Sequence, residues 1–149
     1  MLEKGILRVI DVNFNRAKEG LRVVEDIFRF ILENDTLRKK TRYLRHELDE
    51  ISKENILKVS ILSRDSKSDI GRETDHLEIK RDDVNSLLYI NLQRVKESLR
   101  VLEEFFKLVI PRKVSKIKTL RYEIYTLEKK IIKKWPPLRN PGYKSNKAK

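Results

Sequence analysis

The sequence predicts an all-α protein, an antiparallel helical bundle of two internally repeated helical hairpins with an irregular central segment. Charged residues make up 39% of its 149 residues, and Gly and Pro occur only four times each, which suits long helices with solvated faces. Apolar residues recur at helical spacing along both halves of the chain. A run of residues from the first half also returns near residue 91, which indicates a duplicated structural unit.

The repeat fixes the expected architecture. Nine of the eighteen positions from 13 to 30 recur identically 78 positions later. A second, shorter motif is repeated 76 positions apart: Leu44-Arg45-His46-Glu47-Leu48 resembles Leu120-Arg121-Tyr122-Glu123-Ile124. Two copies with so long a period do not form a solenoid. We expect a single domain over residues 1–135, in which repeat 1 (about 11–53) and repeat 2 (about 82–134) pack about a pseudo-two-fold axis.

The first hairpin is predicted from its apolar face and its capping residues. Residues 13–32 carry apolar side chains on one helical face, and Asp11 or Asn13 can cap the start of this helix. The polar residues 34–36 end it and cap a second helix over about 37–52.

The second hairpin follows a less regular stretch, the central segment at 56–80. Aspartates at 82–83 can cap a third helix that reaches Ile110. Pro111 suits the start of a fourth helix, which continues to about Lys134.

Composition and charge narrow the function classes. The net charge is +12, and residues 133–149 supply six cations and no acids. We expect 136–149 to be a basic flexible tail and do not expect a nucleic-acid partner, although a helical nucleic-acid-binding protein using this tail is one alternative. The chain has no Cys and no run of ~20 apolar residues, which argues against thiolate metal sites and a membrane span. Its start does not resemble a leader peptide, so we expect a cytoplasmic protein.

Each copy carries an Asn-Arg-Glu set near the apolar sector of its first helix. The sets are Asn13, Arg16 and Glu19 in the first copy and Asn91, Arg94 and Glu97 in the second. At about 100° per residue, the Asn and Arg of each set fall within the apolar sector. Arginines facing a bundle interior are costly unless an anion meets them. Either the Glu and Asn side chains satisfy them in a structural network, or both sets face one pocket for an anion, and the guanidinium fork favours phosphate or diphosphate.

The central segment offers a second candidate set, Arg64, Asp65, Asp69 and Gly71. The two carboxylates are spaced to share a hard cation such as Mg²⁺. The same residues are also typical of a solvated turn, so both interpretations stay open.

Other residues that could carry chemistry are few. His46 occupies the position in the second repeated motif that Tyr122 occupies in the other copy, so the pseudo-symmetry is broken there. An asymmetric substrate would require such a difference. The alternative is that His46 has a purely structural role. His76 has no neighbour at metal-ligand spacing. With only four glycines, the chain has no Gly-rich phosphate loop, and it has neither a Gly-x-Ser-x-Gly elbow nor a Cys nucleophile. Phosphoryl transfer stays open because it needs mainly positioned cations and Mg²⁺.

The motifs resemble the helical hydroxymethylpyrimidine-phosphate kinase family of thiamine biosynthesis, which is unrelated to ribokinase-type enzymes. The resemblance rests on 10–26, 44–48, Arg64-Asp65 with Asp69-Ile70-Gly71, and 91–104, and it extends from about Ile10 to Glu128. Val95 and Ser98 depart from the family pattern, where smaller or alanine-like residues are commoner. In that family the domain is often fused ahead of a thiamine-phosphate synthase barrel. No barrel sequence follows here, so we do not expect synthase activity in this chain.

The resemblance implies ATP-dependent phosphorylation of 4-amino-5-hydroxymethyl-2-methylpyrimidine phosphate to its diphosphate, with ATP and Mg²⁺. It implies catalytic roles for Glu19, Asp65 and Asp69, which would hold Mg²⁺ (Asp65 and Asp69 above all) or accept the hydroxymethyl proton. The implied substrate-binding residues are Asn13, Arg16, Arg22, Arg45, His46, Asn91, Arg94 and Glu97, and the implied nucleotide-binding residues are Arg64 and Gly71. The alternative is a non-catalytic domain that binds pyrimidine phosphates or associates with the synthase as a regulator. The sequence does not decide whether two chains associate as a homodimer.

Overall fold

The computed structural model describes residues 2–74 and 79–135, so the predictions for His76 and for the tail 136–149 lie outside the described residues. Within these ranges the regular structure is entirely helical and contains no strand, which confirms the predicted all-α class. The elements are α1 (Leu2–Asp26), the π-helical turn η1 (Ile27–Ile31), α2 (Asp35–Ser52), α3 (Asn55–Ser60), η2 (Ile61–Ser63), α4 (Val84–Val109), η3 (Pro111–Lys113) and α5 (Val114–Lys134). No helix in the described part has the length and apolar character that a membrane span requires.

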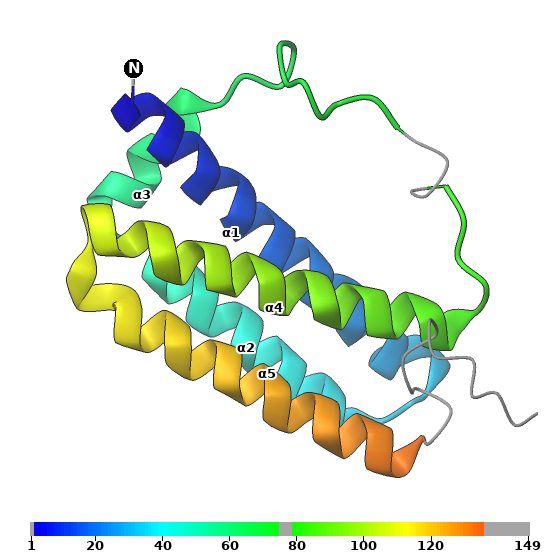
Figure 1. Ribbon diagram of the computed structural model, residues 1–149. Helices are drawn as coiled ribbons and strands as arrows, with labels where there is room; N and C mark the ends of the chain where they lie inside the picture. Colours follow the sequence, from blue (N-terminus) through cyan, green and yellow to red (C-terminus); the bar gives the residue numbers. More distant parts are fainter. Residues whose placement is uncertain (1, 75–78, 136–149) are drawn as a thin grey trace, which may run out of the picture.

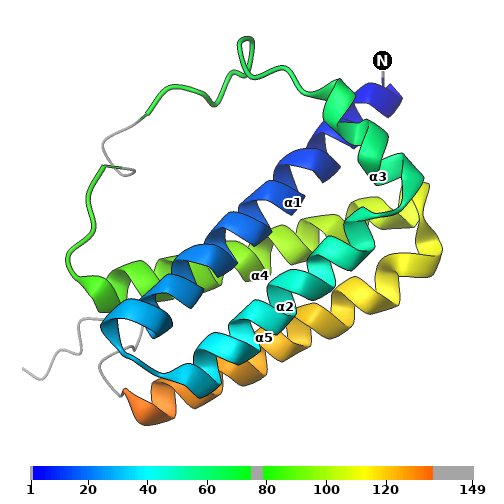
Figure 2. The same ribbon diagram turned by 180° about the vertical axis from the view of Figure 1, so that it is seen from behind.

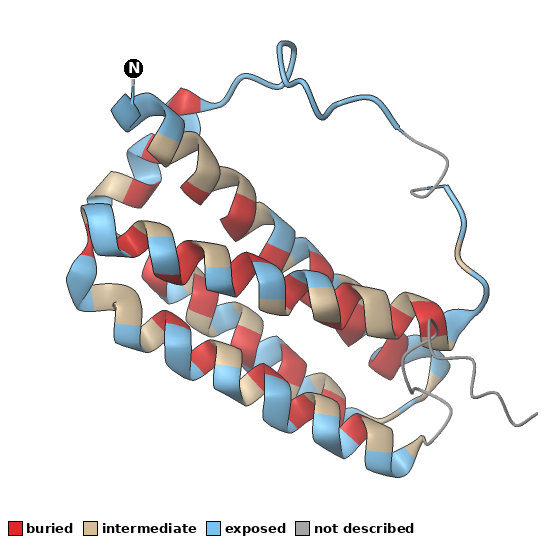
Figure 3. Cartoon of the chain, in the orientation of Figure 1, coloured by how far each residue is buried: buried red, intermediate tan, exposed pale blue. Residues whose placement is uncertain are grey.

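The two copies form two hairpins that pack through their first helices. Helix α1 lies along α4, α2 packs on α1, and α5 packs on α4 (Figures 1 and 2). Buried residues line the sides of the helices that face one another, and exposed residues cover the outside (Figure 3). The core includes the tilted ring pair Phe14 and Phe106, one from each copy, whose centroids lie 5.8 Å apart. The repeated helices therefore share one core.

Side-chain caps hold the starts of two helices where the sequence suggested them. The Asn34 side chain accepts a hydrogen bond from the Leu37 backbone N–H at 2.8 Å, at the start of α2. Asp83 does the same for the Ser86 N–H at 2.7 Å, at the start of α4. Each cap satisfies a backbone donor that has no partner within its helix.

The start of α1 differs from the prediction. The helix begins at Leu2, so neither Asp11 nor Asn13 caps it, and both lie in its interior. Its apolar face extends toward the N-terminus through Ile6 and the fully buried Ile10, and this extra burial stabilises three further turns. The helix is therefore long enough to present residues before the repeated motif to the same surface.

A close approach at Gly20 sets the distance between α1 and α4. A Cβ atom on Gly20 would lie 2.7 Å from Val95 Cγ2 and 3.3 Å from the Asn91 carbonyl oxygen. The matching position in the second copy is Ser98, whose hydroxyl donates to the Arg94 carbonyl at 2.7 Å. Val95 can occupy this crossing because the facing residue has no side chain.

The central segment is partly helical. Helix α3 and the short turn η2 follow α2, and residues 64–74, here called the strap, then contain no helix and are all exposed (Figure 1). Arg64 ties the strap to α1 because its Nε and Nη2 donate to the two carboxylate oxygens of Asp11, each at 2.8 Å.

Candidate active site

The repeated arginines are exposed, and the prediction that they face the bundle interior is wrong. Asn13 and Asn91 are buried as expected, but Arg16, Arg94 and the two glutamates of their sets are exposed. Position 16 lies at the flank of the buried stripe of α1, beyond Asn13, so its long side chain emerges beside the crossing with α4. Because these arginines are exposed, the cost of burying their charge cannot be used as an argument for an anionic ligand.

The two arginines nevertheless face the same hollow. This hollow, the crossing cleft, has a volume of about 700 Å³ and is lined by Asn13, Arg16, Thr74, Arg94, Glu97, Ser98 and Val101. One arginine from each copy lines this cleft, as we expected from the pseudo-two-fold axis under one of two alternatives. Asn91 is not among its lining residues.

A second hollow adjoins the first at Arg16. This strap cleft has a volume of about 600 Å³ and lies between α1 and the strap. Its charged lining residues are Arg8, Asp11, Arg16, Glu19, Arg64, Asp65 and Asp69. Both volumes fall in the range that small-molecule sites occupy. The structure therefore brings the predicted catalytic residues and Arg64 to one cleft, beside the cleft that holds the repeated arginines.

The buried asparagines brace the helices from within. The Asn13 side-chain amide donates to the Val9 carbonyl, and that of Asn91 donates to the Leu87 carbonyl, each at 2.8 Å. These equivalent bonds satisfy amide donors that would otherwise be buried without partners. Both asparagines thus have a structural role, and Asn13 in addition faces the crossing cleft.

The acids of the strap shape its turns. Asp65 Oδ1 accepts the Ser68 backbone N–H at 3.1 Å, and this hydrogen bond lowers the pKa of the Asp65 carboxyl. Asp69 Oδ1 accepts the Gly71 N–H at 2.8 Å, so that N–H is already used within the turn. These bonds are those of a solvated turn. In the described residues no three or more His, Asp or Glu side chains come close enough to hold a metal ion by themselves.

Arg64 is largely committed to the strap. The hydrogen bonds that it donates to Asp11 raise the pKa of its guanidinium above the ordinary value. Two of its donors are therefore engaged by a carboxylate, although the side chain still lines the strap cleft.

Arg16, Glu19, Arg94 and Glu97 differ from these paired residues. Within the described part of the chain, none of their side chains makes a hydrogen bond or an ion pair. Their charged groups line the two clefts, and of the four only Glu19 interacts electrostatically with a described neighbour, Arg64, without forming an ion pair with it. These four residues are therefore available to a ligand.

Arg22 and Arg45, both predicted to bind substrate, pair with a buried acid instead. Glu25 is 3% exposed and accepts a hydrogen bond from Arg45 Nε at 3.0 Å, while Arg22 Nη1 lies 3.6 Å from the same carboxylate. Neither arginine lines either cleft. His46 is exposed on α2 and also lies outside both clefts, so none of these three predicted substrate-binding residues lines the candidate site.

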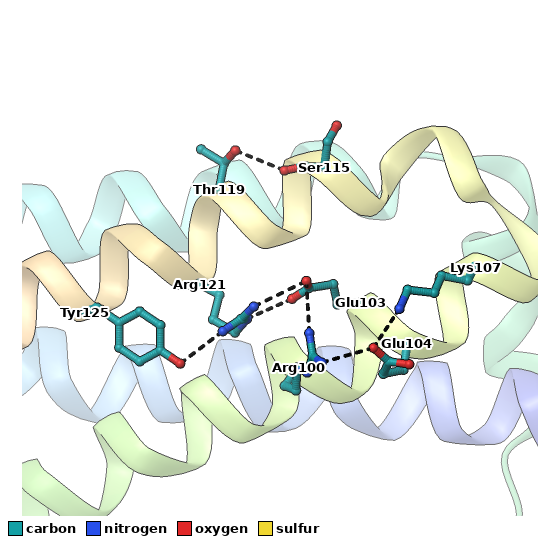
Figure 4. A network of polar contacts seen from close by, with 8 residues as sticks. All are labelled: Arg100, Glu103, Glu104, Lys107, Ser115, Thr119, Arg121 and Tyr125. Atoms are coloured by element: carbon teal, nitrogen blue, oxygen red, sulfur yellow. Dashed lines mark hydrogen bonds and ion pairs between the residues drawn. The ribbon is translucent and has the colours of Figure 1, made fainter.

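The second copy repeats this arrangement. Glu103 is also 3% exposed, and Arg121 donates to it from Nε at 2.7 Å and from Nη2 at 3.3 Å (Figure 4). Arg100 Nη1 reaches the same carboxylate at 3.3 Å, and Arg121 Nη1 donates to the Tyr125 hydroxyl at 3.0 Å. The hydrogen bond to Glu103 raises the pKa of Arg121. In each copy, a buried glutamate paired with an arginine of the next helix therefore holds the two helices of the hairpin together.

Sequence reasoning missed six polar lining residues: Arg8, Asp11, Asn15, Ser66, Thr74 and Ser98. Arg8 and Asn15 lie seven residues apart on α1, a spacing that places them on one helical face. The signal was present, but the helix was expected to begin after Arg8. Thr74 lies in the strap, where no periodicity could indicate its direction.

Comparisons with known proteins agree on one family. The model of the ThiD2 family matches residues 8–130. The chain belongs to the ThiD2 family. Curated relatives of this ThiD2-family chain include thiamine-phosphate synthases of Synechocystis sp., 42% identical over 129 residues (86% of this chain and 36% of the relative), and of Nostoc punctiforme, 37% identical over 132 residues (88% and 36%).

A third relative is the thiamine-phosphate synthase of Prochlorococcus marinus subsp. pastoris, 40% identical over 129 residues, which cover 85% of this chain and 35% of that protein. The ThiD2-family chain thus spans about a third of the length of the curated relatives that it matches. No solved structure matches it.

Proposed function

We propose that this ThiD2-family chain acts in thiamine biosynthesis as a kinase that uses ATP to convert 4-amino-5-hydroxymethyl-2-methylpyrimidine phosphate to its diphosphate. The resemblance of its motifs supports the kinase reaction, and the thiamine-phosphate synthase names of its relatives support the biosynthetic context. The observation that carries the proposal is the position of Arg16, which lines both adjoining clefts. Two phosphorylated ligands could meet at this one guanidinium.

The reaction defines what the protein must supply. An oxygen of the substrate phosphate forms a bond to the terminal phosphorus of ATP, the bond from that phosphorus to the β,γ-bridging oxygen breaks, and ADP leaves with the electron pair. The accepting phosphate is already ionised at neutral pH, since its second pKa is about 6. No hydroxymethyl proton has to be removed, because that oxygen already carries the phosphate. The protein therefore has to bring two anions together and stabilise their charge.

The unpaired arginines meet this requirement. Arg16 and Arg94 line the crossing cleft from the two copies, and neither has a partner among the described residues. Guanidinium groups bind phosphate oxygens in a bidentate manner and remain charged at every physiological pH. We assign the substrate phosphate and the transferred phosphoryl group to these two side chains.

The acids of the strap cleft suit a metal ion that arrives with the nucleotide. Glu19, Asp65 and Asp69 line one cleft, yet no group of three acids in the described residues forms a cage. Mg²⁺ in kinase sites is usually held by one or two carboxylates together with the phosphates and water, which fits this arrangement. The ion would neutralise phosphate charge, and the carboxylates would orient it.

Arg16→Ala tests the proposal. With ATP, Mg²⁺ and the pyrimidine monophosphate, we expect turnover to diphosphate to fall on the order of 100-fold, as for the loss of one charge-stabilising donor. Arg42→Ala is the matched control because Arg42 is exposed on α2 and lines neither cleft. Unchanged turnover in Arg16→Ala would refute the role of Arg16. If the wild-type chain binds the monophosphate but forms no diphosphate with ATP, the chain is a binding domain and the kinase proposal fails.

A further inference from the structure

Resting on the proposed function, we infer that the two clefts have different ligands. The strap cleft takes the Mg²⁺-bound nucleotide triphosphate, with Arg8 as a phosphate ligand, and the crossing cleft takes the pyrimidine phosphate.

The charges of the strap cleft fit a metal-bound triphosphate. Arg8 and Arg16 lie on the same wall of α1 as Glu19, and Asp65 and Asp69 face them from the strap. A triphosphate with Mg²⁺ needs cations for its oxygens and carboxylates for its metal within one site. The strap cleft supplies both.

The crossing cleft has a different composition. Arg16 and Arg94 face a single acid, Glu97, with the Asn13 amide and the hydroxyl-bearing Thr74 beside them. Two arginines against one carboxylate suit a phosphate monoester. The carboxylate, amide and hydroxyl groups can hydrogen-bond to the amino group and ring nitrogens of a pyrimidine. With the single acid Glu97, the crossing cleft is a poorer metal site than the strap cleft, which has Glu19, Asp65 and Asp69.

Among the described residues, the strap cleft is found in the first copy only. Arg8, Asp11 and Asn15 of α1 correspond to Ser86, Tyr89 and Gln93 of α4, so the second copy has no charged stripe at this place. The crossing cleft, in contrast, uses equivalent arginines from both copies. A reaction between two different ligands needs two non-equivalent sites, and the molecule provides them on the two sides of Arg16.

Arg8 is the better candidate for a nucleotide ligand than Arg64. Asp11 engages Arg64 through two hydrogen bonds of 2.8 Å. Among the described residues, Arg8 donates only to the backbone carbonyl of Asp65, at 3.5 Å, and it forms no ion pair, although its charge helps to lower the pKa of the Asp65 carboxyl. A phosphate could therefore recruit Arg8 without breaking an ion pair.

Equilibrium binding separates the two clefts without requiring turnover. Titration calorimetry would measure a non-hydrolysable ATP analogue with Mg²⁺, and separately the pyrimidine monophosphate, on the wild-type chain and on Arg8→Ala, Arg94→Ala and the control Arg42→Ala. Since a charge-assisted hydrogen bond is lost, we expect Arg8→Ala to weaken the analogue at least tenfold and to leave the monophosphate within twofold. Arg94→Ala should do the reverse.

The outcomes distinguish this inference from the proposed function. A monophosphate loss in Arg8→Ala, or equal losses of both ligands in both variants, overturns the division between the clefts. Wild-type chain that binds both ligands with the expected variant pattern but makes no diphosphate refutes the kinase and leaves the division standing. Wild-type chain that binds neither ligand overturns both. Arg8→Gln, which keeps most of the aliphatic stem, serves as the second variant if Arg8→Ala melts at a lower temperature.

Discussion

The two copies of the repeat keep the same internal bonds but present different surfaces. In both, a buried Asn donates one turn back along its helix, and a buried Glu accepts hydrogen bonds from an arginine of the next helix. In the part of the chain that the structure describes, only the first copy has the charged stripe that begins at Arg8 and the Asp11–Arg64 ion pair that ties the strap to α1. The repeated polar residues therefore divide into a set that holds each hairpin together and a set that faces the clefts.

The largest expected effect concerns the buried ion pairs. Arg121→Met should lower the free energy of unfolding by about 3 kcal/mol, because Glu103 would be left buried without its main partner. Arg45→Met should cost less, since Arg45 reaches Glu25 by one hydrogen bond and its side chain is 17% exposed against 11% for Arg121. Urea denaturation of both variants measures the difference.

Kinetics give the control for this pair of variants. Neither arginine lines a cleft, so KM for the pyrimidine phosphate should stay at the wild-type value at temperatures where the variants are folded. A raised KM in Arg45→Met with unchanged stability would restore the substrate-binding role predicted from the sequence.

A smaller effect is expected at the helix crossing. Gly20→Ala places a Cβ 2.7 Å from Val95 Cγ2, and overpacking of this kind costs roughly 1–3 kcal/mol. The better helix propensity of Ala offsets about 1 kcal/mol of this cost, so we expect the free energy of unfolding to fall by about 1 kcal/mol in total. The matched change in the second copy, Ser98→Ala, should stay within about 0.5 kcal/mol. Equal losses of unfolding free energy in Gly20→Ala and Ser98→Ala would contradict the close approach that the structure shows at Gly20 alone.

The smallest effect concerns a contact between the copies. Glu54 pairs with Arg112 at 2.5 Å and with Lys113 at 3.1 Å, and the hydrogen bond from Lys113 lowers the pKa of its carboxyl. The matching residue of the second copy is Lys130, which cannot make the same ion pairs, so the described residues form this link once.

Because the folded-state pKa of Glu54 is the lower one, the unfolded chain takes up the proton first as pH falls. The stabilisation from this carboxylate is thus present above the unfolded-state pKa of about 4.3 and is lost below it. Glu54→Gln should flatten the fall in thermal midpoint between about pH 5 and pH 3. An identical pH profile in the variant and the wild-type chain would show that exposure to solvent has screened the pair.

The sequence predicted the helices better than the direction of their polar side chains. Apolar spacing and the caps at Asn34 and Asp83 located α2 and α4 because those signals are local. The start of α1 was missed because Asp11 resembles a cap, whereas the burial of Ile10 extends the helix past it. Propensity at a single residue was outweighed by tertiary packing.

The site was predicted as a set of residues and only partly as an arrangement. The pseudo-two-fold axis suggested, as one of two alternatives, a pocket shared by Arg16 and Arg94, and both line the crossing cleft. Helical geometry placed the two arginines too deep, since a rotation angle does not show how far a long side chain extends. Arg45 was assigned to the substrate by the family resemblance, and it lies in a repeated motif as Arg16 does. A repeat alone does not distinguish a residue that braces a helix pair from one that faces solvent, and only the burial of Glu25 separates them.

The crossing cleft has a consequence for how such a fold could have arisen. Its two arginines belong to different halves of the chain, so an ancestral polypeptide of half the length would have carried only part of this recognition surface. Two such polypeptides, associated as a symmetric pair, would have completed it with identical walls. Gene fusion would then have freed one wall to diverge, and the stripe that begins at Arg8 is the kind of specialisation that a single uninterrupted chain permits.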